Sequence, residues 1–89
     1  MANLTFNSIA PSIWEATSEV NGDFNLHIEK TSGTVTVRQK TAGTLFADTA
    51  VLNSENVIDV DFVGNVYPKT IKVVVTGERP SVGIITESE

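Results

Sequence analysis

Residues 24–38, with the sequence FNLHIEKTSGTVTVR, alternate apolar and polar side chains in two runs separated by a short loop. An alternation with a period of two is typical of a β-strand that has one buried face and one solvated face. The loop contains Gly33, and a short glycine-containing loop between two alternating runs favours a β-hairpin. The sequence therefore predicts paired strands at about 23–30 and 34–40, with one dry face.

The same alternation recurs along most of the chain. It predicts further strands at about residues 3–9, 13–20, 44–52, 57–62, 70–76 and 82–85. Asn21-Gly22 is the strongest short hairpin signal, because a type I′ turn requires a positive φ at both central residues. Other turns are predicted at 31–33, 41–43, 53–55 and 64–65. The segment 44–52 is either one bent strand or two short strands that break at Asp48.

The number and spacing of these strands indicate the fold class. Roughly seven or eight short strands are typical of an all-β domain, either a small barrel or a single small antiparallel β-sandwich, Ig-like or jelly-roll-like. The chain has no cysteine, so it lacks the cysteine–tryptophan–cysteine core of a true immunoglobulin domain. We predict one β-sandwich domain over residues 1–89, with residues 1–12 as a candidate extended N-terminal segment.

Charge and composition exclude several classes of partner. The net charge is −5, with 11 acidic residues against 6 basic ones that are spread along the chain. Binding to nucleic acid or to an anionic membrane needs a concentrated positive surface, so neither partner is expected. Residues 1–12 lack the basic and apolar runs of a signal peptide, and no segment has about 20 apolar residues in a row. Synthesis and folding in the cytoplasm are therefore expected.

The residues that could carry catalysis or bind metal are few. His27 is the single histidine and is expected on the polar face of its strand, where the sequence supplies no partner group. Asp59 and Asp61 share one strand face and could join Asp48 or Asn53 around a hard cation, but their spacing matches no calcium-loop pattern. A solvated face that discourages edge pairing is the favoured interpretation. We therefore predict no enzyme activity, no catalytic residue, no metal and no cofactor.

Aromatic and valine side chains supply the candidate binding residues. Trp14 and Tyr67 could stack on sugars, but Trp14 is expected to close one end of the core and Tyr67 to lie in a loop. Val74 lies between two other valines, so both faces of its strand are apolar. Such a strand is either covered on both sides or meets a partner subunit, whereas a single exposed valine would need no explanation.

Three segments carry a whole-chain resemblance to a known class of protein: DFNLHIEKTSGTVTV, VIDVDFVG and IKVVVTGERPSVGI. In a short, acidic chain without cysteine, this pattern resembles the small β-sandwich virion structural proteins of tailed bacteriophages. That class includes capsid decoration, auxiliary capsid and minor head or tail proteins. The resemblance lies in style and not in a diagnostic motif, so no residue role is transferred by it.

The resemblance implies a non-enzymatic virion structural protein that binds an assembled capsid or tail lattice and stabilises or decorates it. Its implied partners are major capsid or other virion proteins, with self-association as a further option, and its implied location is the virion. The alternative is a carbohydrate- or cell-surface-binding β-sandwich module. We expect residues 1–12 and 63–69 to be contact segments, because termini and loops adapt most easily to a partner. The candidate partner-binding residues are Leu4, Phe6, Trp14, Tyr67 and Val74.

Overall fold

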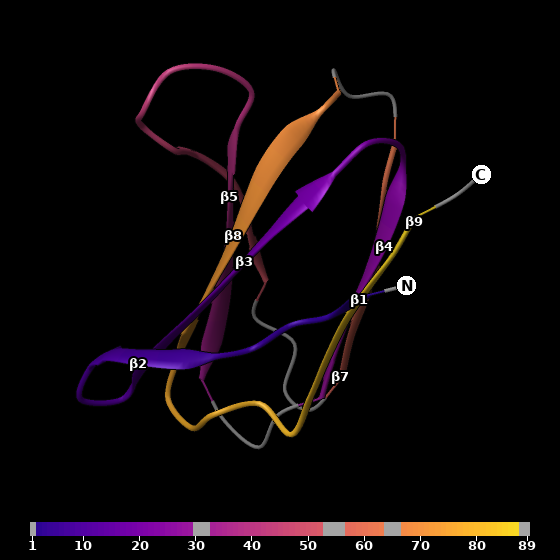
Figure 1. The fold of residues 1–89 in the computed structure, drawn as a ribbon. Coiled ribbons are helices and arrows are strands. Elements are labelled where there is room, and N and C mark those ends of the chain that lie inside the picture. The colour runs from indigo at the N-terminus through magenta and orange to yellow at the C-terminus, as the bar shows by residue number, and fades with distance from the viewer. Residues whose placement is uncertain (1, 30–32, 53–56, 64–66, 88–89) are drawn as a thin grey trace.

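The computed structural model describes residues 2–29, 33–52, 57–63 and 67–87, and over these ranges the chain is all-β with no helix. Nine antiparallel strands form two sheets (Figure 1). The strands are β1 (Ala2–Asn3), β2 (Asn7–Ala10), β3 (Ile13–Val20), β4 (Phe24–Glu29), β5 (Thr34–Lys40), β6 (Ala47–Leu52), β7 (Val57–Phe62), β8 (Lys69–Thr76) and β9 (Val82–Glu87). The predicted all-β class with two packed antiparallel sheets is confirmed.

One sheet has four strands in the order β1-β9-β4-β7, and the other has five in the order β2-β3-β8-β5-β6. Their dry faces meet in a single core, as the alternation predicted, because every second residue of β4 and β8 is buried, as are Val35 and Val37 of β5. The buried apolar side chains are Phe6, Ala16, Val20, Phe24, Leu26, Ile28, Val35, Val37, Ile58, Ile71, Val73, Val75 and Ile85.

The predicted hairpin between 23–30 and 34–40 is wrong. β4 pairs with β7 and β9, whereas β5 pairs with β6 and β8, so these consecutive strands belong to opposite sheets. Alternation determines which face of a strand is dry, and two strands with dry faces can meet across a core as well as side by side. Gly33 has a φ of 94°, and a Cβ there would overlap the carbonyl oxygen of Thr76. A glycine at position 33 therefore lets the backbone pass close to Thr76 just before β5 begins.

The hairpin predicted at Asn21-Gly22 is also wrong, because the chain crosses there from β3 in one sheet to β4 in the other. Neither residue has the positive φ that a type I′ turn requires. The amide of Asn21 instead donates to the Glu87 carboxylate at 2.5 Å. Long-range pairing of both strands has overridden a local turn preference.

The predicted strand at 3–9 is divided between the two sheets. β1 pairs with β9 and β2 pairs with β3, so the segment between them crosses the end of the sandwich. Phe6 lies in this crossing, is 5% exposed, and packs where a Cβ on Gly83 would stand. Residues 2–10 are therefore built into both sheets, and the burial of Phe6 explains why one strand became two.

The predictions for 44–52 and for three turns have different outcomes. Residues 47–52 form the single strand β6. Its register with β5 shifts between Ala50, which pairs with Val37, and Asp48, which pairs with Arg38. β5 and β6 form a hairpin closed by residues 41–46, a loop that projects from the sheets in Figure 1. The turn residues predicted at 31–32, 53–55 and 64–65 lie outside the described ranges.

Candidate functional site

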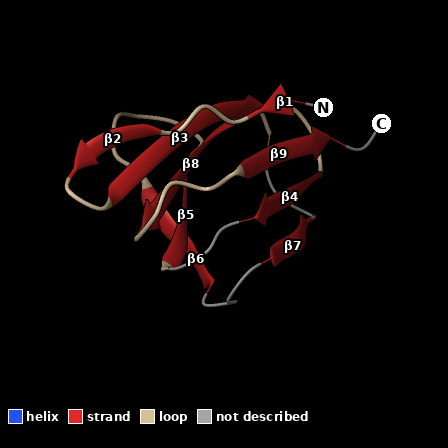
Figure 2. Ribbon diagram, turned by 90° about the horizontal axis from the view of Figure 1, so that it is seen from below, coloured by secondary structure: helices blue, strands red, loops and turns tan. Residues whose placement is uncertain are grey.

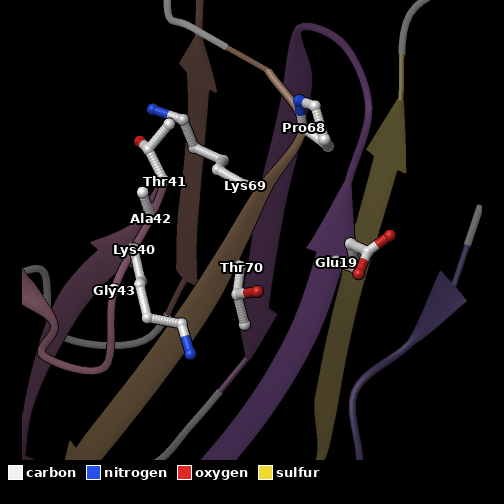
Figure 3. Close-up of a pocket in the computed structure, with 8 residues that line it drawn as sticks. All are labelled: Glu19, Lys40, Thr41, Ala42, Gly43, Pro68, Lys69 and Thr70. Carbon is white, nitrogen blue, oxygen red and sulfur yellow. The ribbon is translucent and has the colours of Figure 1, made fainter.

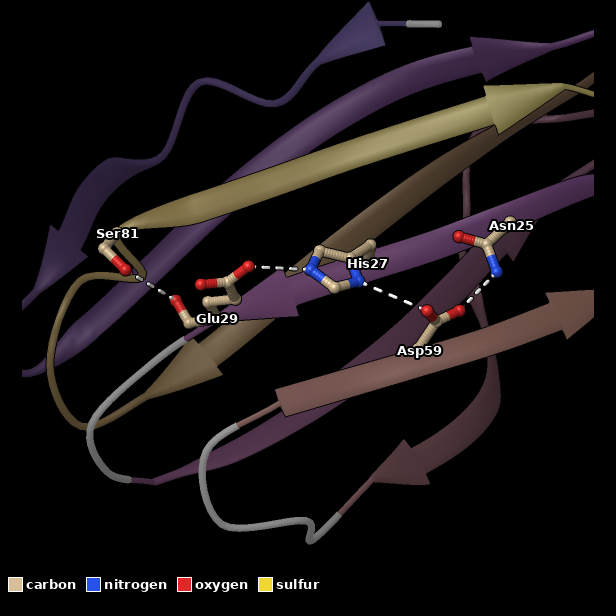
Figure 4. Close-up of polar contacts among 5 residues, drawn as sticks. All are labelled: Asn25, His27, Glu29, Asp59 and Ser81. Carbon is tan, nitrogen blue, oxygen red and sulfur yellow. Dashed lines mark hydrogen bonds and ion pairs between the residues drawn. The ribbon is translucent and has the colours of Figure 1, made fainter.

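A polar cluster lies on the outer face of the four-stranded sheet. Figure 4 shows the His27 imidazole between two carboxylates, Glu29 on its own strand β4 and Asp59 on β7. The Nε2 atom of His27 is 2.9 Å from Glu29 Oε2, and its Nδ1 atom is 3.4 Å from Asp59 Oδ2. The Asn25 amide donates to Asp59 at 2.5 Å and to Asp61 at 2.8 Å. The residues are neighbours because β4 and β7 pair with Asn25 opposite Asp61 and His27 opposite Asp59.

The cluster favours a charged imidazole. The hydrogen bond to Glu29, followed by that to Asp59, raises the pKa of His27 above its ordinary value. The hydrogen bond from Asn25, followed by that from His27, lowers the pKa of Asp59. Two carboxylates contact the imidazole and Asp61 lies beside them on the same face, so acidic side chains outnumber the one basic side chain in this cluster.

The geometry of His27 differs from that of a hydrolytic base. In a serine hydrolase one ring nitrogen faces a hydroxyl and the other faces a carboxylate, whereas both nitrogens of His27 face carboxylates. Ser81, drawn beside the cluster in Figure 4, donates its hydroxyl to the backbone carbonyl of Glu29 at 3.2 Å. Within the described ranges, no three His, Asp or Glu side chains are placed to hold a metal ion. Asp48 pairs with Arg38 on the other sheet at 2.9 Å.

A pocket of about 200 Å³ lies at one end of the five-stranded sheet, between β3, β8 and the loop that follows β5. Lys40 and Lys69 both line it, but Figure 3 shows their ammonium groups pointing in different directions. Lys40 lies over the Phe46 ring, with its nitrogen 5.1 Å from the ring centre. The pocket therefore offers an anion no pair of converging cations.

Lys69 is a buried charge that the sequence did not predict. It is 4% exposed, and its ammonium donates to Gln39 Oε1 at 2.8 Å and lies 5.5 Å from the Tyr67 ring centre. It occupies an inward position of β8, two residues before the buried Ile71. The alternation of β8 was the signal that could have found it, because inward positions recur at every second residue.

The two candidate sugar-stacking rings do not form one platform. Trp14 pairs in register with Val75 near the end of β8 and donates its indole N–H to the Gly77 carbonyl at 3.3 Å. Tyr67 precedes the start of β8 and donates its hydroxyl to Asp23 at 3.2 Å. The length of β8 separates them by roughly 20 Å. Both rings are partly buried against the core.

The remaining candidate partner-binding residues are scattered over the molecule. Phe6 is part of the core, and Leu4 is half-buried beside Gly83. Val74 lies on the outer face of the five-stranded sheet, half-buried between Glu15 and Thr36 of the adjacent strands. The structure does not bring these residues together, and their partner-binding role remains a prediction.

Exposed apolar side chains lie elsewhere, on or near the two edge strands β6 and β7. Of the five large apolar side chains that are exposed in the described ranges, four lie on these strands or within two residues of them. They are Leu45 (85% exposed), Val51 (59%), Val57 (52%) and Val63 (66%), and we call them the β6–β7 flank. Both strands lie at the lower side of the domain in Figure 2. The fifth side chain, Ile9, is on β2 at the other edge of the five-stranded sheet.

Comparison with known proteins leaves the fold as the only classification. No family model, curated protein or solved structure matches the chain. No helix in the described ranges is long and apolar enough to cross a membrane. The protein belongs to the class of small all-β domains built from two packed antiparallel sheets.

Most of the β6–β7 flank was missed from the sequence. Each of its members stands next to a less exposed apolar residue in the sequence, so the pattern alone does not show which side chain is exposed. Exposed apolar residues are also common on protein surfaces. Only the strand order shows that β6 and β7 are both edge strands, so only the structure groups these residues.

Proposed function

We propose that this chain is a non-enzymatic virion structural protein, which binds an assembled phage capsid or tail lattice and stabilises or decorates it. The observation that carries the proposal is the β6–β7 flank, four exposed apolar side chains that lie on or near two edge strands. Edge strands that carry exposed apolar side chains favour docking to another protein, which would cover both the strand edge and those side chains. The whole-chain resemblance to tailed-phage sandwich proteins supplies the kind of partner.

The size of the domain is compatible with such a contact. A stable protein interface covers about 800 Å² on each partner. The domain exposes 5198 Å², so one side of the sandwich would be enough. A lattice multiplies such a contact over many copies, and each copy adds burial between neighbouring subunits.

The mechanism is binding by shape and apolar burial. Leu45 projects from the loop that closes the β5–β6 hairpin, and the next residue, Phe46, is held between Lys40 and Lys72. The Lys72 nitrogen lies 4.2 Å from the centre of the Phe46 ring. This anchoring lowers the entropy that a contact through Leu45 would cost.

Co-sedimentation tests the proposal. The purified chain is mixed with purified virions and empty capsids from the phage or cell that encodes it, and bound chain is measured against added chain. We expect saturable binding at a fixed number of copies per particle. Absence of binding to both kinds of particle would overturn the proposal.

Matched variants locate the contact. Leu45→Ser with Val51→Thr removes two apolar groups of the flank, and Ile9→Thr makes a similar change on β2. We expect the double variant to lose most of its binding and Ile9→Thr to bind like the native chain. Equal binding by both variants would place the contact outside the flank.

A further inference from the structure

The four edge strands of the two sheets differ in how well they could accept a further strand. β1 has two residues, the pairing of β2 shifts between Ser8 and Ala10, and the pairing of β6 with β5 also shifts. β7 alone runs for six residues, Val57 to Phe62, in unbroken register with its neighbour β4. Short strands and bulges protect an edge against pairing, so β7 is the least protected edge in the part of the chain that the structure describes.

The two faces of β7 have different chemistry. Ile58, Val60 and Phe62 pair with inward residues of β4, and the Phe62 ring stacks on Phe24 with centroids 4.9 Å apart. Ile58 is 2% exposed, whereas Val60 and Phe62 are only partly buried, so the core is incompletely covered at this edge. Asp59 and Asp61 point outward and are exposed. An added strand would meet apolar groups on its inner side and carboxylates on its outer side.

The carboxylates disfavour a second copy as the added strand. If two β7 strands paired antiparallel, the acidic positions would face one another or Val57, and like charges directly opposite are destabilising. Four of the chain's basic residues, Arg38, Lys40, Lys69 and Lys72, are on strands already paired inside the five-stranded sheet. A second copy could offer them as an edge only by opening that sheet.

We propose that β7 binds an extended segment of a partner protein, in which apolar residues alternate with lysine or arginine, as an added antiparallel strand. Its apolar side chains cover Val60 and Phe62, its basic side chains pair with Asp59 and Asp61, and its backbone bonds to the free edge. This inference rests on the proposed function, because it assigns the edge of β7, which begins at Val57 of the flank, as the lattice contact and gives the chemistry of the partner.

A peptide titration followed by amide NMR tests the inference. The probe is a blocked octapeptide of alternating lysine and valine. The first control replaces every lysine by glutamate, and the second is N-methylated on alternate residues so that one edge cannot donate hydrogen bonds. We expect saturable shifts centred on Val57–Phe62 with the lysine peptide, and no saturation with either control.

Protein variants separate pairing at β7 from general attraction to a negatively charged chain. Asp59→Asn with Asp61→Asn keeps the side-chain shapes and removes both charges, and Glu19→Gln removes one charge from the exposed face of β3. The first should weaken the lysine peptide about tenfold, and the second should leave it nearly unchanged. An amide spectrum that is unchanged away from β7 and its neighbour β4 shows that the double variant is folded.

Three outcomes would overturn the inference: shifts centred on β2 or β6, similar binding of the lysine and glutamate peptides, or self-association of the chain through β7. If particles bind the native chain and its Asp59/Asp61 variant equally while the peptide does not bind, the inference fails and the proposed function stands. If the peptide binds and the particles do not, the proposed function fails, whereas the binding of a basic strand at β7 is still supported.

Discussion

His27 and Asp59 face each other directly across β4 and β7, with His27 Nδ1 3.4 Å from Asp59 Oδ2. Among the strands that the structure describes, β7 pairs with β4 only, so this contact and the Asn25 hydrogen bonds join the edge to the sheet through side chains as well as backbone. The state of one imidazole therefore affects how firmly the edge is held.

Stability should fall as the pH rises above the ordinary histidine range. The pKa of His27 is raised above 6.5 in the folded chain, so its contribution is complete below pH 6.5 and is lost as the pH rises through the folded value. Denaturant unfolding at pH 5.5 and 8.5 should show greater stability at the lower pH, and His27→Gln should remove most of the difference. An undiminished difference in His27→Gln would contradict the pairing.

The contribution of Asp59 to stability changes with pH in the opposite direction to that of His27. The pKa of Asp59 is lowered below 3.8, so its contribution is present above pH 3.8 and is lost as the pH falls through the folded value. The pair should therefore contribute most between these two limits. Titration of the Asp59 carboxyl by NMR should show a midpoint below 3.8 in the native chain and a higher one in Asn25→Ala, because the Asn25 hydrogen bond is the largest cause of the shift.

Two glycines form a matched pair for a backbone test. Gly33 and Gly43 have φ values of 94° and 78°, but a Cβ on Gly33 would overlap Thr76, whereas a Cβ on Gly43 meets nothing within 4 Å. Gly43→Ala should cost about 1 kcal/mol from backbone strain alone. Gly33→Ala adds steric overlap and should cost about 3 kcal/mol. Equal losses in urea unfolding would mean that the chain does not approach Thr76 at Gly33.

The valines of β8 test the assignment of its two faces. Val73 is fully buried, and its neighbour Val74 is half-buried on the outer face. Val73→Ala should cost about 2 kcal/mol through lost burial and the resulting cavity, and Val74→Ala should cost less than about 1 kcal/mol. The reverse order in thermal or urea unfolding would show that β8 presents its other face to the core.

Lys69 should be replaceable if its polar partner is replaced with it. Lys69→Met alone leaves Gln39 Oε1 without its 2.8 Å donor, whereas Lys69→Met with Gln39→Leu removes both polar groups. The double variant should be within about 1 kcal/mol of the native chain or more stable, because a buried charge is costly to desolvate. A loss above about 3 kcal/mol in urea unfolding would show that the ammonium is needed for folding.

The strands were predictable because alternation reports directly on burial. Residues 13–20, 34–40 and 57–62 were predicted with the bounds that the structure has. The pairing was not predictable, because β4 and β5 satisfy the same dry-face pattern whether they lie side by side or on opposite sides of a core. Asn21-Gly22 illustrates the limit, because a strong local turn signal lost to long-range pairing of both flanking strands.

The His27 cluster and the β6–β7 flank could not be predicted for the same reason, because the sequence does not show which strands pair. His27 was expected on a polar strand face, and it is there, but its partner Asp59 lies 32 residues away and becomes adjacent only through the β4–β7 register. The valines of the β6–β7 flank likewise are recognised as edge residues only when the strand order shows that β6 and β7 are edges.

Amide hydrogen exchange of the chain on purified particles tests the docking claim most directly. The chain is exchanged free and particle-bound, and the change in protection is mapped onto its strands. The account predicts that new protection gathers on residues 47–52, 57–62 and the segment around Leu45, with β2 unchanged. Protection that gathers on β2 and β3, or that is absent from β6 and β7, would contradict it.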